Sequence, residues 1–233
     1  MDLFLKFIEF IIISYSFEII SLYFLKKFII SEEKDTYKTI DIAIGGALYK
    51  EKGSKFIGYV YPVTAEDDIK NCIHDLKKKH HAARHWCYAW QIGVKNKQHR
   101  VNDGGEPNNS AGQPIYGQII AKDLTNVLVV VVRYFGGTKL GVGGLMTAYK
   151  TTAKLILEEA TIVEKTINVS FKLNFEYADM NKVMKIIKDQ NLIILKQQME
   201  LNCEYEVEVR EKNANKVEQL FSELRCLKIK RLV

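Results

Sequence analysis

The sequence predicts an α+β protein of two domains, and three observations support this. An unbroken apolar run, Val127–Val132, is followed by a glycine-rich segment and then by apolar residues at helical spacing. The composition changes near residues 161–166, and strand-like and helix-like segments alternate from there onward. A length of 233 residues with 47% hydrophobic residues is enough for a buried core in each of two small domains.

The first domain, predicted over residues 36–162, is expected to contain both strands and helices. The buried run Val127–Val132 is too short and too β-branched for a helix and therefore predicts a strand. Glu51-Lys-Gly-Ser54 has the composition of a hairpin turn. The other expected elements are strands over residues 47–50, 56–61 and 86–94, a turn-rich loop over residues 102–114 and a short helix over residues 115–121.

A further helix is predicted to begin at Thr64. Asp67, three residues later, has the position of a capping-box acid. The run Lys77-Lys-Lys-His-His81 places positive charge at the C-terminal end, where the helix dipole favours it. The stripe predicted to be buried consists of Ile69, Cys72, Ile73 and Leu76.

The second domain, predicted over residues 166–233, follows a boundary near Thr161–Thr166. Glu204, Glu206 and Glu208 alternate with apolar residues, so one face of its sheet is expected to meet water or a partner. The expected elements are strand 167–175, helix 179–190, strands 192–198 and 204–210, helix 214–224 and strand 227–232. This βαββαβ order is the ferredoxin-like plan.

The apolar extension over residues 1–35 does not fit this globular pattern. Glu9 and Glu18 divide its apolar run, and each acid at the centre of a bilayer would cost about 2.5–3.5 kcal/mol. Three explanations stay open: a weak membrane or interface anchor, an apolar helix packed on the body, and translated non-coding sequence ahead of the true start. We favour the third, because AT-rich codons specify Phe, Ile, Tyr and Lys.

Charge and cysteine usage indicate the class of partner and the compartment. The formal net charge of +6 favours an anionic partner such as RNA or a ribosomal surface. The four cysteines form no dense framework and there is no cleavable-signal pattern, which is typical of reduced thiols in a cytoplasmic protein. Membrane association is expected only if residues 1–30 are a true anchor. Neither a cofactor nor sequence-specific contact with DNA is implied.

The segment after the buried strand predicts an anion-binding site. Glycine lets backbone N–H groups approach a phosphate closely, and the unpaired N–H groups of the next helix point toward such an anion. One cation, Lys139, interrupts the glycines. The predicted phosphate-binding glycines are Gly136, Gly137, Gly141, Gly143 and Gly144. The alternative is that they serve only tight packing of strand against helix.

This segment does not match the known nucleotide-binding loops. It lacks the Gly-Lys-Ser/Thr ending of a P-loop, and Gly-Val-Gly-Gly-Leu-Met lacks the third glycine of the dinucleotide fingerprint. We therefore expect no nucleotide cofactor.

Basic residues elsewhere in the first domain are expected to extend the site. Arg84 and Arg133 form the predicted rim, and Lys77–Lys79 continue it. Cations hold phosphates and the rings of Tyr134 and Phe135 can stack on bases, so the cluster favours contact with RNA. The alternative for each lysine is a solvated helix end.

No metal site is expected in this chain. Cys72-x-His74 and His85-x-Cys87 contain soft ligand types, but no Cys-x-x-Cys occurs. Cys72 is moreover already assigned to the buried stripe of a helix.

Two acids in the turn-rich loop define an enzymatic alternative. Asp103 and Glu106 can form the acid/base pair of a hydrolase acting on a phosphorylated or peptidic substrate, in a cleft beside the glycine segment. The surrounding Gly, Asn and Pro residues instead favour a turn whose carboxylates accept loop N–H groups. Cys87 has no base at an interpretable spacing, so a binding role is preferred. A third alternative is an interaction module that uses the ferredoxin-like sheet.

Two motifs resemble the IMPACT family. Asn102-Asp-Gly-Gly-Glu-Pro-Asn-Asn-Ser-Ala-Gly-Gln-Pro114 resembles its acidic Gly-Glu-Pro loop. Val131-Val-Arg-Tyr-Phe-Gly-Gly-Thr-Lys-Leu-Gly-Val-Gly-Gly-Leu145 resembles its glycine signature. With the βαββαβ tail, the chain is similar to the bacterial, two-domain YigZ-type branch from about residue 36 to residue 233.

The resemblance implies a fold and a setting for the function. The first domain would be like domain four of elongation factor G, with a left-handed βαβ architecture shared with a small-subunit ribosomal protein, and the second like another domain of that factor. It implies a role in translation or its regulation, with Asp103, Glu106 and Ser110 beside the glycine segment. Gly104 and Asn109 stand where many members have Asp and Gly, and Ser110 where they have Thr. Losing an acid at position 104 argues against a two-carboxylate site.

Overall fold

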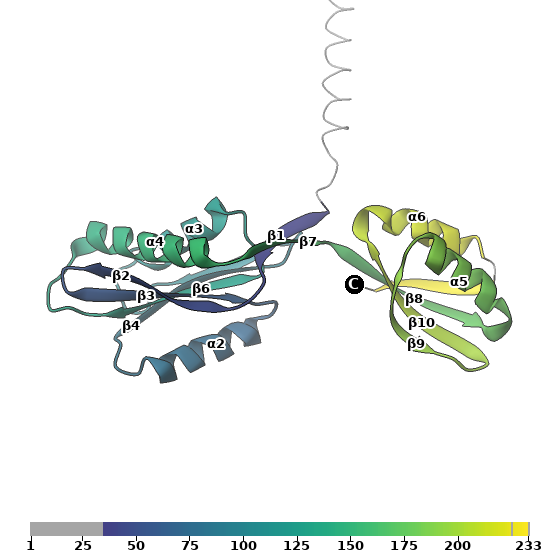
Figure 1. Cartoon of the computed structure of the whole chain (residues 1–233), viewed down its shortest axis with the longest axis horizontal. Coiled ribbons are helices and arrows are strands. Elements are labelled where there is room, and N and C mark those ends of the chain that lie inside the picture. The colour runs from purple at the N-terminus through teal and green to yellow at the C-terminus, as the bar shows by residue number, and fades with distance from the viewer. Residues whose placement is uncertain (1–34, 225, 233) are drawn as a thin grey trace, which may run out of the picture. The chain divides into compact units, whose positions relative to one another are not determined.

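The computed structural model describes residues 35–224 and 226–232 of the chain (Figure 1). They form two compact units, residues 36–169 and residues 170–232 together with Asp35. The predicted apolar extension lies outside the described residues apart from Asp35, so its three explanations stay open. No helix in the described part of the chain is both long and apolar enough to cross a membrane.

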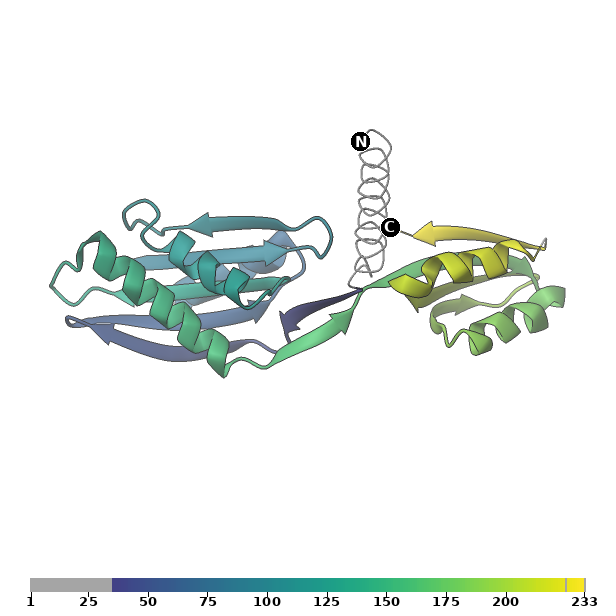
Figure 2. The same cartoon turned by 90° about the horizontal axis from the view of Figure 1, so that it is seen from above.

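The first unit is a five-stranded antiparallel sheet with helices on both faces. Its strand order is β2-β3-β6-β4-β5, and every neighbouring pair is antiparallel. Helix α2 covers one face, while α3 and α4 lie on the other (Figures 1 and 2). The strands are β2 (Ile44–Glu51), β3 (Ser54–Pro62), β4 (His85–Ile92), β5 (Gln98–Asn102) and β6 (Val127–Tyr134), and the helices are α2 (Glu66–Lys79), α3 (Gly112–Ala121) and α4 (Gly141–Glu159).

Strand β6 is the centre of this sheet, and both of its faces are buried. Val129 and Val131 pack in the core under α3 and α4, whereas Val130 and Val132 pack in the core over α2. Each buried valine contributes roughly 1.5–3 kcal/mol relative to an exposed one. The predicted buried strand is therefore confirmed, and burial on both faces explains why its apolar run is continuous.

The start of α2 corrects the predicted cap. The helix begins at Glu66, so the third residue after its N-cap is Asp68 and not Asp67. The Oδ2 atom of Asp68 accepts the backbone N–H groups of Thr64 and Ala65, each at 3.0 Å, and these bonds lower the pKa of its carboxyl. Asp67 instead pairs with Lys70 at 2.8 Å on the surface.

The C-terminal end of α2 is less positive than the sequence predicts, because His80 is buried. Its Nε2 lies 2.6 Å from the hydroxyl oxygen of Tyr59, and its Nδ1 lies 2.9 Å from that of Tyr134. Burial, with a smaller effect from the Lys79 ammonium, lowers the pKa of the His80 imidazole. The Nζ atoms of Lys77 and Lys79 lie over the rings of Trp86 and Tyr59, respectively.

Three strands of this unit were not predicted, namely β5 and two short strands that pair with each other. Strand β1 (Thr36–Ile40) pairs antiparallel with β7 (Ile162–Thr166), in the segment where the sequence predicts the domain boundary. Both strands are short, and most of their side chains are at least partly exposed. The pairing therefore arises between segments far apart in the chain, which local periodicity does not reveal.

The second unit has the predicted order of elements. Its four-stranded sheet has the order β11-β8-β10-β9, with the pairs β11–β8 and β10–β9 antiparallel. The elements are β8 (Asn168–Glu176), the 3-10 turn η1 (Tyr177–Asp179), α5 (Met180–Asp189), β9 (Ile193–Gln198), β10 (Asn202–Arg210), α6 (Glu211–Ser222) and β11 (Leu227–Leu232).

Strand β10 shows the predicted alternation. Its apolar residues, including Tyr205 and Val207, are buried, while the glutamates alternate with them on the open face. Glu204 pairs with Lys172 of β8 at 2.6 Å, and Glu206 pairs with Lys196 of β9 at 3.1 Å. The charges on this face are thus partly neutralised between neighbouring strands.

The burial of His80 predicts a pH-dependent stability. Its folded pKa lies below the ordinary value of 6.5, so as pH falls below that value the unfolded chain binds the proton first. We expect the free energy of unfolding to decrease from about pH 7.5 to about pH 5, and to decrease less in His80→Gln. Urea denaturation across this range measures both slopes. Equal slopes in the two proteins would contradict the neutral, buried imidazole.

Candidate functional site

The glycine segment connects the end of β6 to the start of α4, and its loop residues 135–139 are exposed. Gly137 and Gly141 have φ angles of +90° and +71°, in the left-handed region that favours glycine. A Cβ atom on either would meet nothing within 4 Å, so backbone conformation and not crowding calls for glycine there. The segment therefore presents open backbone at the surface.

Among the residues that the structure describes, no acidic side chain caps the first turn of α4. Its N-cap, Leu140, has helical backbone angles and makes no side-chain capping bond, and no acid lies in the first turn. In contrast, α2 has three acids in its first turn, with Asp68 bonded to N–H groups at its start. The positive end of the α4 dipole and its unpaired N–H groups are therefore available to an anion. The predicted ligands Gly141 and Gly143 are exposed there, and Gly144 is half-buried.

Gly136 has a structural role, which the sequence alone does not distinguish from a role in binding phosphate. Its N–H donates to the Oγ atom of Ser54 at 3.1 Å, so this donor is already engaged. A Cβ at this position would lie 1.9 Å from the carbonyl carbon of Gly53. Gly136 thus allows close approach of the β2–β3 turn, which is a packing role but not the packing of strand against helix that the alternative predicts.

Arg133 is not a free cation of a basic rim. The residue is only 4% exposed and lies at the end of β6, between the rings of Phe56 and Phe135 at 5.3 and 5.5 Å. Its Nη1 donates to Glu106 at 2.6 Å and its Nη2 to Ser54 at 3.3 Å. Its Nε is buried without a hydrogen-bond partner among the described residues. Glu106 therefore pairs with Arg133 internally, and contact of Arg133 with phosphate stays a prediction that this burial does not favour.

Glu106 is the acceptor at the centre of this cluster. Its side chain is 5% exposed, and its Oε1 accepts bonds from Arg133 and from the hydroxyl of Tyr149, the latter at 2.8 Å. His85 Nε2 lies 3.9 Å from the same oxygen. The Nδ1–H of His85 donates to the carbonyl of Gly104 at 3.0 Å, which orients the ring. The carboxylate therefore connects the Gly-Glu-Pro loop to β6, β4 and α4.

Asp103 organises the Gly-Glu-Pro loop through backbone N–H groups. Its Oδ1 accepts from Ala111 and Gly112 at the start of α3, and its Oδ2 accepts from Asn109, all at 2.9 Å. Ser110 is buried, and its hydroxyl donates to the carbonyl of Pro107 at 2.6 Å. Asp103 thus acts as the turn alternative predicts, whereas Glu106 accepts from the side chains of Arg133 and Tyr149 and not from loop N–H groups.

Gly104 leaves no room for the acid that many family members have at this position. Its φ is +55°, and a Cβ would lie 2.7 Å from the carbonyl oxygen of Trp86. Glycine in place of the family's acid at position 104 therefore goes together with the close approach of the backbones of Gly104 and Trp86.

Cys87 and Tyr149 lie in the same buried cluster, and sequence reasoning gave neither a place in the site. The Cys87 thiol donates to the carbonyl of Asp103 at 2.9 Å and lies 3.2 Å from the Tyr149 hydroxyl. Burial raises the pKa of both groups, so both stay protonated. The helical spacing of Tyr149 indicated burial, but only the fold places its hydroxyl beside Glu106. Among the described residues, no three metal-ligating side chains come together in a group that can hold an ion.

The remaining predicted cations are exposed. Lys139 lies in the glycine segment, and Arg84 precedes β4. The backbone N–H of Arg84 donates to the carbonyl of Arg133 at 3.4 Å, which places Arg84 beside the end of β6. Of the cations predicted for the site, Lys139, Arg84 and Lys77–Lys79 are therefore exposed, and Arg133 is not.

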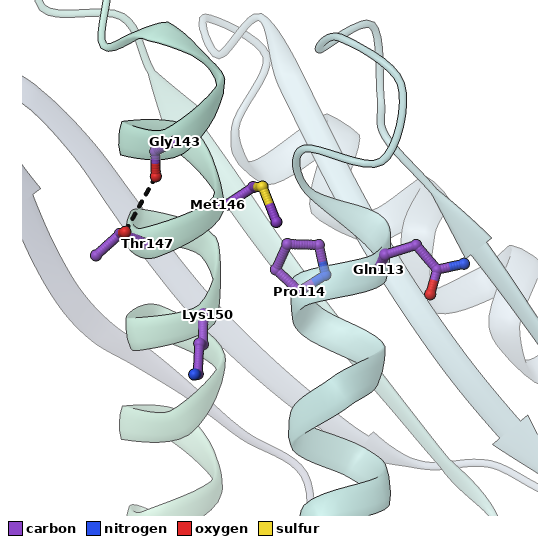
Figure 3. A pocket seen from close by; sticks show the side chains of 6 residues that line it. All are labelled: Gln113, Pro114, Gly143, Met146, Thr147 and Lys150. Atoms are coloured by element: carbon purple, nitrogen blue, oxygen red, sulfur yellow. Dashed lines mark hydrogen bonds between the residues drawn. The ribbon is translucent and has the colours of Figure 1, made fainter.

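A groove beside this segment is a feature that sequence reasoning missed (Figure 3). It lies between the N-terminal turns of α3 and α4 and has a volume of about 490 Å³. Its lining residues are Gln113, Pro114, Gly143, Met146, Thr147 and Lys150. Gln113, Pro114 and Gly143 lie at the ends of the two motifs, whereas Met146, Thr147 and Lys150 lie outside both, so the motifs alone do not predict the groove.

The buried ion pair predicts a specific pattern of stabilities. Glu106→Gln leaves the Arg133 guanidinium without a countercharge, so we expect the free energy of unfolding to fall by about 3–5 kcal/mol. Glu106→Gln/Arg133→Met removes both charges and should recover most of this loss. Urea denaturation provides the measurement. Lys70→Gln, which breaks an exposed pair with Asp67, is the control and should leave the midpoint unchanged.

The close approach at Gly136 predicts opposite effects of the same change at two glycines. Gly136→Ala forces its Cβ against Gly53, and we expect the free energy of unfolding to fall by about 1–3 kcal/mol. Gly117→Ala, inside α3 with open space around it, should gain up to about 1 kcal/mol. Thermal unfolding compares them. A neutral Gly136→Ala would show that the two segments do not need this contact.

The comparisons with known proteins agree with the two motifs. A family model described as the Impact N-terminal domain matches residues 52–157. The IMPACT family member YvyE of Bacillus subtilis is 31% identical to this chain, covering 73% of it and 79% of that protein. The IMPACT family member YigZ of Escherichia coli is 30% identical, covering 58% of this chain and 68% of that protein.

A solved structure supports the mixed α+β fold. It is a crystal structure described as that of a hypothetical protein, and it matches with a TM-score of 0.65 at 24% identity. The match covers 85% of this chain and 97% of the other, so it extends over the larger part of both. The similarity to YvyE, with the family model and the two motifs, shows that the chain belongs to the IMPACT family.

Proposed function

We propose that this IMPACT-family chain binds RNA phosphates within the translation machinery of the cytoplasm, and that it acts by binding and not by catalysis. The observation that carries the proposal is the open first turn of α4, which has no capping side chain and no acid. The exposed glycines Gly137, Gly141 and Gly143 and the exposed Lys139 lie in or next to this turn. Together they offer N–H groups, a helix dipole and a cation to a single anionic group.

The setting in translation is inferred from the family. The first domain is proposed to be related to domain four of elongation factor G, and the second to be a ferredoxin-like module. RNA and ribosomal surfaces present regularly spaced phosphates, and a chain with a net charge of +6 is attracted to them. Because helix N–H groups contact phosphate and not base edges, the phosphate contacts would position the RNA without reading its sequence.

Arg133 and Glu106 enter this proposal as positioning residues. They hold Ser54, and through it the N–H of Gly136, at the beginning of the glycine segment. The hydrolase alternative gains no support from this geometry, since Glu106 is almost fully buried and its Oε1 already accepts two hydrogen bonds. Binding is therefore the function that the exposed groups favour.

A carboxylate in the first turn of α4 tests the proposal. Val142 is 52% exposed there, so Val142→Glu places a charge at the helix N-terminus without burying it. Stability should be kept or raised by about 0.3–1 kcal/mol, while the affinity for single-stranded RNA falls about tenfold because the carboxylate repels phosphate. Fluorescence anisotropy measures the affinity. Val142→Gln is the uncharged control, and equal affinities of the Glu and Gln variants would remove the proposal.

Removing the one cation of the segment tests its contact with phosphate. Lys139→Ala should weaken RNA binding and reduce the slope of log K against log salt by about 0.7, the value for one phosphate contact of a single strand. Lys154→Ala, in the C-terminal half of the same helix, is the matched control. A slope unchanged by Lys139→Ala would show that this ammonium meets no phosphate.

A further inference from the structure

The groove between α3 and α4 adjoins the proposed phosphate site through one shared residue. Gly143 lies in the open first turn of α4 and also lines the groove. Having no side chain, it leaves the path between the two open. A volume of about 490 Å³ falls within the range of small-molecule sites in proteins. A ligand bound at the helix end by its anionic group can therefore extend a second part into the groove.

The walls of the groove suit a flat, weakly polar group. Met146 on α4 and Pro114 on α3 point toward one another (Figure 3). Met146 is 44% exposed although it is apolar, and a thioether packs favourably against the edge or face of an aromatic ring. Since the two side chains come from different helices, a planar ring between them would contact both.

The polar groups at the groove can supply hydrogen bonds without negative charge. The Thr147 hydroxyl donates to the carbonyl of Gly143 at 3.0 Å, so it is engaged within the helix. Gln113 and Lys150, both exposed, offer an amide and an ammonium. None of the described residues that line the groove carries a carboxylate, and the positive end of α4 lies beside it. The positive helix end complements an anionic group, and the side chains of Met146 and Pro114 complement a planar ring, so an aromatic ring attached to a phosphate matches both parts of the site.

We propose that this groove receives an unpaired base of RNA whose phosphate is bound at the first turn of α4. The inference rests on the proposed function and extends it from phosphate contact to a preference for single strands. Bases in a duplex are paired and stacked, so they cannot enter a groove between two helices, whereas bases of loops and ends can. Stacking of a base on a side chain tolerates any sequence, because every base has a π-face.

The test compares three ligands with the full chain and its variants. The ligands are a single-stranded RNA of about 12 nucleotides, a duplex RNA of the same length and inorganic polyphosphate, which has no bases. Affinities come from fluorescence anisotropy and from competition. Met146→Ala removes one wall, and Ile120→Ala is the matched control because Ile120 is an apolar residue, 51% exposed, on α3 outside the groove.

We expect Met146→Ala to lower the affinity for single-stranded RNA about tenfold and to leave the affinities for duplex RNA and polyphosphate unchanged. Met146→Leu should retain most of the affinity. RNA that contains 4-thiouridine should crosslink to a peptide that includes Met146 in the wild-type chain.

Other results would overturn the inference in distinguishable ways. If Met146→Ala binds single strands as wild type does while Val142→Glu binds weakly, the base groove is wrong and the phosphate site stands. If Met146→Ala weakens all three ligands equally, the groove does not select bases. If wild type binds none of the ligands, both proposals fail. A self-association in sedimentation that Met146→Ala abolishes would assign the groove to a second copy of the chain instead.

Discussion

The hydrogen-bonded ion pair between Glu106 and Arg133 is the interaction on which the geometry of the site depends. Through its oxygens and guanidinium it connects the Gly-Glu-Pro loop to β6, to Ser54 at the start of β3 and to Tyr149 on α4. Removing one charge of a buried ion pair strongly lowers the free energy of unfolding, because the remaining charge then lacks both water and a partner. The glycine segment starts from this cluster, since Ser54 also accepts the N–H of Gly136.

The same cluster separates two kinds of positive charge in the first unit. Arg133 is neutralised inside the protein, whereas Lys139 and the first turn of α4 remain open to solvent. Carboxylates are bonded at the starts of α2 and α3, where Asp68 and Asp103 accept backbone N–H groups. An anion approaching this unit thus meets one helix start that has no internal anion, and this contrast supports the choice of α4 as the phosphate site.

The sheet of the second unit has one buried face and one open, charged face. The sheet buries one set of alternating side chains against α5 and α6, and it pairs charges across the open face. These ion pairs are largely exposed, so they contribute little to the free energy of unfolding. The open face is consequently less suited to an anionic partner than the glycine segment is, because glutamates lie among its lysines.

Local patterns in the sequence determined the buried strand β6, the glycine segment, the start of a helix after it and the βαββαβ order of the second unit, because periodicity and residue type act over a few neighbours. They could not determine that Arg133 is buried, or that β1 pairs with β7, or that Met146 faces Pro114. Each depends on segments distant in the chain, and the exposure of a cation is set by whatever packs around it. Residue type therefore identified the candidate ligands, and only the tertiary structure decided which of them can reach a ligand.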